Sequence, residues 1–107
     1  MRALLVVDML NDFVTGAVRN EARALRIVPA VRRLIDHARS DADWLVVYAS
    51  DAHRADDHEV EVMGRHAMAG TLGGMVIEQL APQGLEREFV LGKRFYGAFD
   101  GTDLDDT

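Results

Sequence analysis

Three short apolar runs lie along the chain and predict its sheet. Residues 3–7 (ALLVV) are apolar without interruption, and residues 44–49 (WLVVYA) and 88–91 (EFVL) are the other two runs. An uninterrupted apolar run of this length is typical of a strand in a parallel sheet with helices on both faces. We therefore expect three strands, the first of them covered above and below.

Between these runs the spacing of apolar residues becomes helical. Residues 21–37 repeat apolar positions every three or four residues, which predicts an amphipathic helix. Pro29 lies inside this segment and predicts a kink or the first turn of the main helix. Residues 72–80 predict a shorter helix, closed by Pro82 and Gly84. Strands that alternate with helices indicate an α/β fold with a parallel sheet.

The remaining segments are polar. Residues 9–20 predict a loop that leaves the end of the first strand. Residues 50–71 form a long polar stretch with three of the four histidines, and loops of this length in a compact domain are usually functional. Thr102 and Asp105 predict the start of a further helix.

Composition and charge limit the classes of function. A chain of 107 residues suits one compact domain, and its net charge of -6 disfavours nucleic acid and anionic membranes as partners. The short apolar start is followed at once by Asp8, which argues against a signal peptide or membrane span and for a cytoplasmic protein. Because the chain has no cysteine, it contains no disulfide, thiolate metal site or cysteine nucleophile of its own.

The predicted topology leaves one strand edge open. Right-handed crossovers place the three strands in the order 3-2-1, so the most apolar strand lies at an edge. An apolar edge strand promotes pairing or aggregation unless it is covered. We expect it to be covered by further strands of the same protein outside these residues, by a second chain that carries them, or by a symmetric copy. We therefore expect a homo-oligomer or pairing with a missing C-terminal half.

Charged residues come directly after the predicted strands. Asp8 follows the first strand, Asp51 the second and Lys93 the third. The carboxyl ends of parallel strands meet at one edge of the sheet, where such folds build their active sites. We therefore expect Asp8 and Lys93 to lie together in a catalytic site. The alternative is a structural ion pair, or two separately solvated charges.

A second group of residues has the spacing of metal ligands. Asp51, His53, His58 and His66 lie within one loop, and a mixed set of carboxylate and imidazole ligands suits Zn, Fe or Mn. In the alternative, the loop is only hydrogen-bonded, with Asp51 orienting His53 and with His58 in solvent. The neighbouring acidic residues raise the local negative potential without selecting a cation.

Four segments in a fixed order carry a family resemblance. ALLVVDMLNDFV, DAHRADDHEV, GRHAMAGTLGG and GKRFYGAFDGTDLDD together resemble the N-terminal part of the isochorismatase-like cysteine hydrolases, the superfamily that includes the nicotinamidases. The resemblance covers nearly the whole chain. It implies a three-layer, Rossmann-like parallel sheet of six strands in the order 3-2-1-4-5-6. Residues 1–107 would then be the N-terminal part of a single domain, supplying strands 1–3 and their helices.

The resemblance also implies the roles of individual residues. The family uses an Asp–Lys–Cys triad, of which Asp8 and Lys93 match two members, while the cysteine would lie beyond Thr107. A lysine ammonium stabilises a thiolate, and an aspartate can take the thiol proton and return it to a leaving amine. Phe13 corresponds to an aromatic residue that stacks on a flat substrate, and Tyr96 would wall the same cleft. Both aromatics could instead be core residues.

The resemblance extends to cofactor and substrate. Nicotinamidases hold one divalent metal through an aspartate and histidines in the corresponding loop, whereas many relatives with a similar Asp-x-His segment bind none, and no organic cofactor is expected. The implied activity is hydrolysis of a carbon–nitrogen bond in a small amide, with residues 1–107 inactive alone. The alternative is a non-catalytic truncated paralogue that acts as a dimerising or metal-binding module. An aspartate-phosphate domain fits poorly, because no second acid stands two residues after Asp8.

Overall fold

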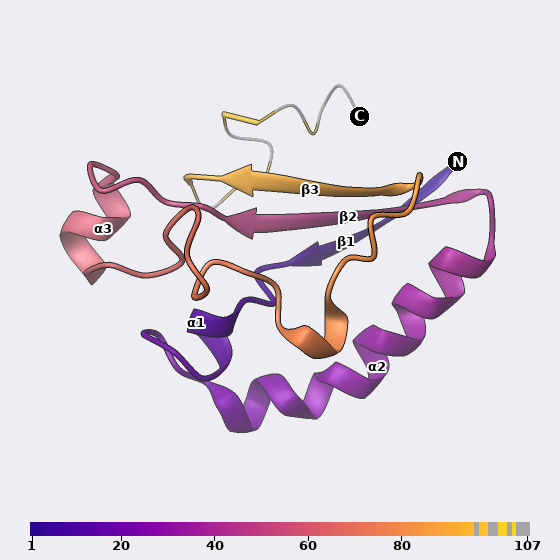
Figure 1. The fold of residues 1–107 in the computed structure, drawn as a ribbon, viewed down its shortest axis with the longest axis horizontal. Coiled ribbons are helices and arrows are strands. Elements are labelled where there is room, and N and C mark those ends of the chain that lie inside the picture. The colour runs from indigo at the N-terminus through magenta and orange to yellow at the C-terminus, as the bar shows by residue number, and fades with distance from the viewer. Residues whose placement is uncertain (96, 99–100, 103, 105–107) are drawn as a thin grey trace.

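The computed structural model describes residues 1–95, 97–98, 101–102 and 104 (Figure 1). Its strands and helices follow one another in the order β1 (Arg2–Val7), α1 (Asn11–Val14), α2 (Glu21–Ser40), β2 (Trp44–Asp51), α3 (His58–Met63), the 3-10 helix η1 (Glu78–Leu80) and β3 (Glu88–Lys93). The predicted α/β class and all three predicted strands are confirmed.

The three strands form one parallel sheet in the order β1-β2-β3. β2 therefore lies in the centre, and β1 is an edge strand, as the right-handed crossovers predict. All three carboxyl ends point toward the same side of the molecule, where α1 and α3 also lie (Figure 1). The sheet thus brings the ends of strands that are distant in sequence to one edge.

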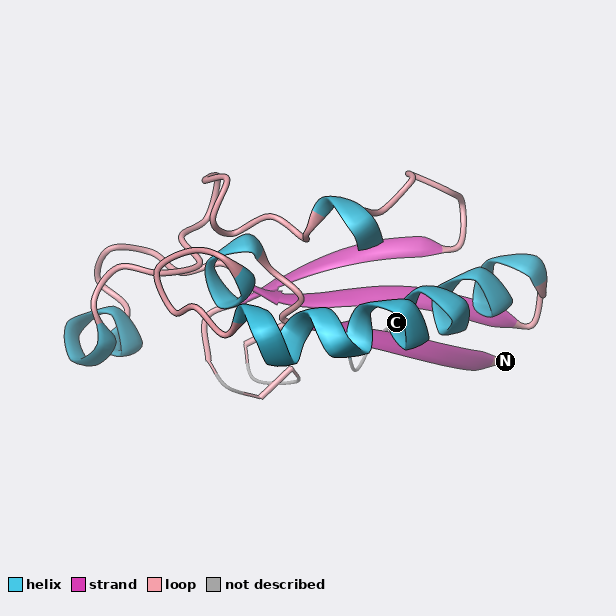
Figure 2. Cartoon of the chain, turned by 90° about the horizontal axis from the view of Figure 1, so that it is seen from below, coloured by secondary structure: helices cyan, strands magenta, loops and turns pink. Residues whose placement is uncertain are grey.

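Helix α2 covers one face of the sheet (Figure 2). Its buried residues Ile35 and Ala38 pack with Val6, Tyr48 and Leu80 in the hydrophobic core. The helix begins about two turns before Pro29 and continues through it, so the proline is not in its first turn. Packing of this apolar face against the sheet supports the helix even though a proline lacks the amide hydrogen that the helix would use.

The opposite face of the sheet differs from the expectation. Leu5 and Val7 of β1 are 39% and 48% exposed, and Phe89 of β3 is 43% exposed. Among the described residues no helix packs on this face, so β1 is buried on one face only. Leu104 approaches Leu5 there and lines a shallow apolar hollow with it.

The segment before β3 is less helical than predicted. Within residues 72–80, only Glu78–Leu80 forms a helical turn. A Cβ atom at Gly73 would stand 2.2 Å from a carboxylate oxygen of Asp12, and one at Gly74 would stand 2.5 Å from a backbone oxygen of Met68. These glycines permit close approach of chain segments in place of a helix. The helix expected near Thr102 and Asp105 lies partly on residues outside the described part of the chain.

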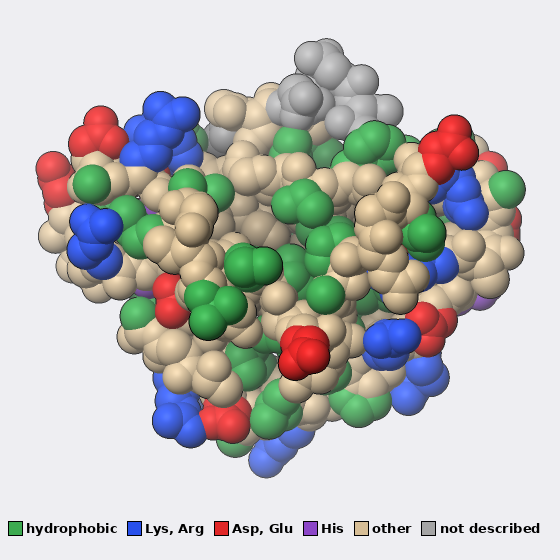
Figure 3. Space-filling model, in the orientation of Figure 1, with side chains coloured by type: hydrophobic (Ala, Val, Ile, Leu, Met, Phe, Trp, Pro, Cys, Tyr) green, Lys and Arg blue, Asp and Glu red, His purple; other side chains and the backbone are tan. Residues whose placement is uncertain are grey.

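The surface drawn in Figure 3 has hydrophobic side chains near its centre and most of its charged side chains around the outline. Among the described residues, none of the helices has the length and apolar character needed to cross a bilayer.

Two neighbouring residues of α2 test this packing. Ile35 is fully buried, whereas Leu34 is 55% exposed. We expect Ile35→Ala to lower the free energy of unfolding by about 2–5 kcal/mol, because it leaves a cavity against the sheet. Leu34→Ala, the matched control, should cost less than about 1 kcal/mol. Urea unfolding followed by circular dichroism measures both, and equal costs would contradict the placement of α2.

Candidate functional site

Three charged residues meet at the carboxyl ends of the strands. Nζ of Lys93, the last residue of β3, lies 3.0 Å from Oδ2 of Asp8 and 2.6 Å from Oδ1 of Asp51. Asp51 is the last residue of β2 and is paired in register with Lys93, while Asp8 comes one residue after β1. The structure therefore brings together the three residues that the sequence places after its strands.

The backbone holds Asp8 in a fixed orientation. Its amide donates to the carbonyl of Ala49 at 3.1 Å, which extends the pairing of β1 with β2 by one residue. Its φ of 55° lies in the left-handed region, which aspartate tolerates better than most residues. The amide of Asp51 donates to Oδ1 of Asp8 at 2.8 Å, so Oδ2 remains for Lys93. The Asp8 side chain is 29% exposed and is open to a reactant.

Lys93 is buried, with its side chain only 1% exposed. Burial alone would lower the pKa of its ammonium, but hydrogen bonds to Asp51 and Asp8 outweigh this effect, and the pKa lies above its ordinary value. The backbone oxygen of Phe95 accepts a further, longer hydrogen bond at 3.4 Å. The site therefore holds a permanent positive charge between two carboxylates.

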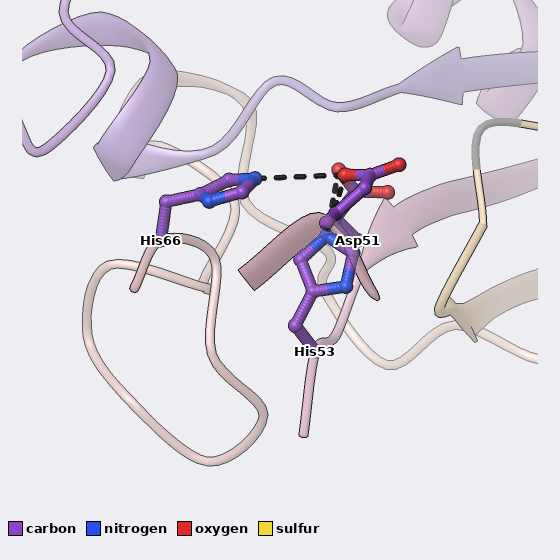
Figure 4. A group of neighbouring side chains, drawn as sticks. Asp51, His53 and His66 are labelled. Atoms are coloured by element: carbon purple, nitrogen blue, oxygen red, sulfur yellow. Dashed lines mark ion pairs between the residues drawn. The ribbon is translucent and has the colours of Figure 1, made fainter. Parts of the chain in front are cut away.

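A second group of side chains shares Asp51. The group consists of Asp51, His53, Glu59 and His66, and we call it the metal group. One ligand atom from each of these residues lies within 4.8 Å of all the others. Figure 4 shows the rings of His53 and His66 directed toward the Asp51 carboxylate region. Nε2 of His53 stands 3.0 Å from Oε2 of Glu59 and 3.5 Å from Oδ2 of Asp51. Four such side chains are the usual number and type for zinc and related ions.

The outer nitrogens of both imidazoles determine which atoms face this group. Nδ1 of His53 lies 3.0 Å from Oδ2 of Asp57, and Nδ1 of His66 lies 2.8 Å from the backbone oxygen of Gly64. Since a carboxylate and a carbonyl oxygen only accept hydrogen bonds, each Nδ1 is assigned as the donor. In the neutral imidazole each Nε2 then carries the lone pair and faces the group, as a metal ligand must.

Polar atoms without partners support the same conclusion. Among the described residues, Nε2 of His53 and Oε1 of Glu59 are buried and make no hydrogen bond of acceptable geometry, although Nε2 lies 3.0 Å from Oε2 of Glu59. Buried polar atoms without partners are costly, and lone pairs that face one another call for a cation between them. The residues present therefore fit a divalent metal ion.

The loop that carries His66 is fixed from two sides. The amide of His53 donates to the carbonyl of Ala67 at 2.9 Å, next to His66. The amide of Ala67, whose φ is 45°, donates to Oδ2 of Asp12 at 2.8 Å. Asp12 lies in α1 and was not selected as a site residue from the sequence. The sequence features that could have indicated Asp12 are its position just after the first strand and the glycine at 73, which permits close approach to it.

The remaining predicted site residues have mixed positions. His58, the first residue of α3, is exposed and does not join the metal group, while its neighbour Glu59 does. Phe13 lies in α1, where its ring meets the His66 ring edge to face at 5.9 Å. Tyr96 lies outside the described residues.

The pKa of Lys93 can be measured directly, because it is the only lysine in the sequence. We expect its pKa to exceed 10.5, since the folded state binds the proton more tightly. The stabilisation is then fully present below the unfolded pKa and is lost as the pH rises through the folded pKa. Lysine-selective 15N labelling gives one Nζ signal for the titration. Asp8→Asn should lower the pKa, and a wild-type value below 10.5 would contradict the geometry.

Comparison with known proteins agrees with this arrangement. Residues 2–107 match the isochorismatase domain family. A probable inactive nicotinamidase from Arabidopsis thaliana is 32% identical over 112 residues, which cover 95% of this chain and 56% of the relative.

Solved structures give the same result. The N-carbamoylsarcosine amidase from Thermoplasma acidophilum is 38% identical, with a TM-score of 0.89 over 98% of this chain and 58% of the relative. A nicotinamidase from Bacillus subtilis is 30% identical, with a TM-score of 0.86 over 97% of this chain and 62% of the relative. The chain thus spans somewhat more than half the length of these relatives. The match over residues 2–107 and the shared fold show that the chain belongs to the isochorismatase-like hydrolase family.

Proposed function

We propose that residues 1–107 are the N-terminal part of one hydrolase domain that cleaves a carbon–nitrogen bond in a small amide. The observation that carries this proposal is the buried Lys93 ammonium 3.0 Å from the Asp8 carboxylate, at the carboxyl ends of β3 and β1. Nicotinamidase and N-carbamoylsarcosine amidase, the named activities of two similar structures, both break such bonds.

The proposed reaction needs a thiol from outside residues 1–107, because this chain has no cysteine. The Lys93 ammonium stabilises the thiolate, and Oδ2 of Asp8 takes the thiol proton. The thiolate attacks the amide carbon, and Asp8 returns the proton to the nitrogen as the carbon–nitrogen bond breaks. Water then hydrolyses the resulting thioester and restores the thiol. Asp8 suits this role better than Asp51, since its side chain is 29% exposed and that of Asp51 only 6%.

We also propose that Asp51, His53, Glu59 and His66 hold one divalent ion, namely Zn, Fe or Mn. When bound, the ion would supply a Lewis-acid position for a heteroatom of the substrate. Asp51 would serve both parts of the site, since Oδ1 accepts from Lys93 and Oδ2 faces His53.

A non-catalytic, metal-binding module is the second candidate function. The four metal-group side chains all come from this chain, whereas the proposed triad is incomplete in it. The similar Arabidopsis protein is named a probable inactive nicotinamidase. The two candidates differ in whether Asp8 and Lys93 support turnover when a thiol is supplied.

The isolated chain should have no amidase activity. We expect no ammonia above the buffer level when the purified chain is mixed with nicotinamide or simple amides, because the chain has no thiol. An enzyme-coupled ammonia assay measures this. Turnover that Asp8→Ala abolishes would overturn the proposed mechanism.

A chimera tests whether Asp8 and Lys93 are catalytically competent. Residues 1–107 replace the matching part of the Thermoplasma amidase, whose C-terminal part supplies the remainder of that enzyme. We expect ammonia release from N-carbamoylsarcosine, and a loss in kcat of about a hundredfold or more in Asp8→Asn, since general acid–base catalysis contributes that much.

The control for this chimera is Asp36→Asn, which removes a carboxylate from an exposed pair on α2. It should leave turnover unchanged. A chimera that folds, by circular dichroism, but releases no ammonia would favour the non-catalytic module.

Metal binding has its own matched pair of histidine variants. We expect the chain to bind one Co2+ or Zn2+ ion, and His66→Ala to weaken binding by at least about tenfold, the lower end of effects known for outer-shell partners. His58→Ala should leave the affinity unchanged, because His58 is exposed and outside the metal group. Calorimetric titration measures the affinities. Equal losses in both variants would contradict the ligand set.

A further inference from the structure

A charged pair lies behind His53, on the side away from the other metal-group residues. Oδ2 of Asp57 accepts from Nδ1 of His53 and from the amide of Arg54, both at 3.0 Å. Oδ1 of Asp57 accepts from Nε of Arg94 at 2.7 Å and from a terminal nitrogen of the same guanidinium. The Asp57 side chain is 4% exposed. Each carboxylate oxygen of Asp57 therefore accepts two hydrogen bonds, and all four come from His53, Arg54 and Arg94.

The arrangement fixes the chemistry of the imidazole. Because the Asp57 carboxylate accepts a hydrogen bond from Nδ1, the neutral imidazole keeps its lone pair on Nε2, which faces the metal group. Two parallel hydrogen bonds from a guanidinium also fix the plane of that carboxylate.

The end of β3 reaches the metal group by two routes. Lys93 hydrogen-bonds to Asp51, one of the candidate ligands, and the next residue, Arg94, hydrogen-bonds to Asp57, which holds His53. Successive side chains of an extended segment point to opposite sides, which allows neighbours to contact separate partners. One short segment thereby supports two of the four candidate ligands.

We propose that Arg94 is a positioning residue for the metal group: through Asp57 it holds His53 with Nδ1 protonated and Nε2 directed at Asp51 and Glu59. This inference rests on the metal site of the proposed function. Arg94 itself contacts none of the four candidate ligands in the hydrogen bonds and ion pairs of the described residues.

An ordinary surface ion pair would behave differently. Arg94 also lies 3.7 Å from Asp56, whose side chain is 85% exposed, and a pair of that kind contributes little. If Arg94 acted only through its charge, its removal would strengthen binding of a cation nearby. If it acts through Asp57, its removal weakens that binding. The sign of the change separates the two.

The first test measures the affinity of the chain for Co2+ by competition with a chelator. We expect Arg94→Met and Asp57→Asn each to weaken binding by about 10–100-fold, the range for loss of an outer-shell partner. The double variant should be no weaker than Asp57→Asn, because both act on His53. Arg94→Lys should recover part of the loss. Asp56→Asn, which removes the same charge one residue away, is the control and should change affinity little.

The second test needs no metal. Histidine-selective 15N labelling gives four imidazoles, and their shifts report which ring nitrogen carries the proton. In the metal-free chain we expect His53 to be protonated on Nδ1 when neutral, and Arg94→Met to produce a mixture of tautomers. Circular dichroism confirms that each variant is folded.

The outcomes of the two tests separate the proposals. Unchanged or tighter Co2+ binding by Arg94→Met overturns the positioning role. If the wild-type chain binds no Co2+, the metal site of the proposed function fails, and the tautomer of His53 alone decides the role of Arg94. An unchanged His53 tautomer in Arg94→Met then overturns it.

Discussion

The site depends on one buried cation. The ammonium of Lys93 forms ion pairs with two carboxylates, at 3.0 Å to Asp8 and 2.6 Å to Asp51. It therefore joins the ends of all three strands. This arrangement follows from the register, because Asp51 and Lys93 are paired across β2 and β3. A slip of one residue would turn one of these side chains to the other face of the sheet. The apolar pairing that fixes the register therefore also fixes the spacing of the charges.

Asp51 connects this ion pair to the metal group. One carboxylate oxygen accepts from Lys93, and the other faces Nε2 of His53 at 3.5 Å. A carboxylate whose two oxygens serve different partners couples them, since a change in charge at one oxygen alters the interaction at the other. Asp8, Lys93 and the candidate metal ligands are thus parts of one polar network, which extends through His53 to Asp57 and Arg94.

The sequence predicts the residues that follow strands better than those in the long loop. Asp8, Asp51 and Lys93 were identified because apolar runs mark the strand ends, and strand ends converge in a parallel sheet. Glu59 is not among the predicted ligands, because the sequence predicts a loop over residues 50–71, and a loop pattern favours neither of two adjacent residues. The short helix α3 decides between them: adjacent helical side chains diverge by about 100°, so Glu59 faces the group while His58 faces solvent. The helix predicted over residues 72–80 failed because its glycines serve close packing, a tertiary contact that local spacing does not reveal.

The carboxylates around His53 differ in whether a lysine or arginine is paired with them. Asp51 has Lys93 as its cation, and Asp57 has Arg94. Glu59 is the third carboxylate of the cluster; its side chain is 11% exposed, and Oε1 has no hydrogen-bond partner among the described residues. Burying a carboxylate without a compensating charge is unfavourable, and for the other two carboxylates Lys93 and Arg94 provide that charge. A divalent ion held by the two Nε2 atoms and the carboxylates would supply the positive charge that no lysine or arginine gives Glu59 in the ion pairs of the described residues.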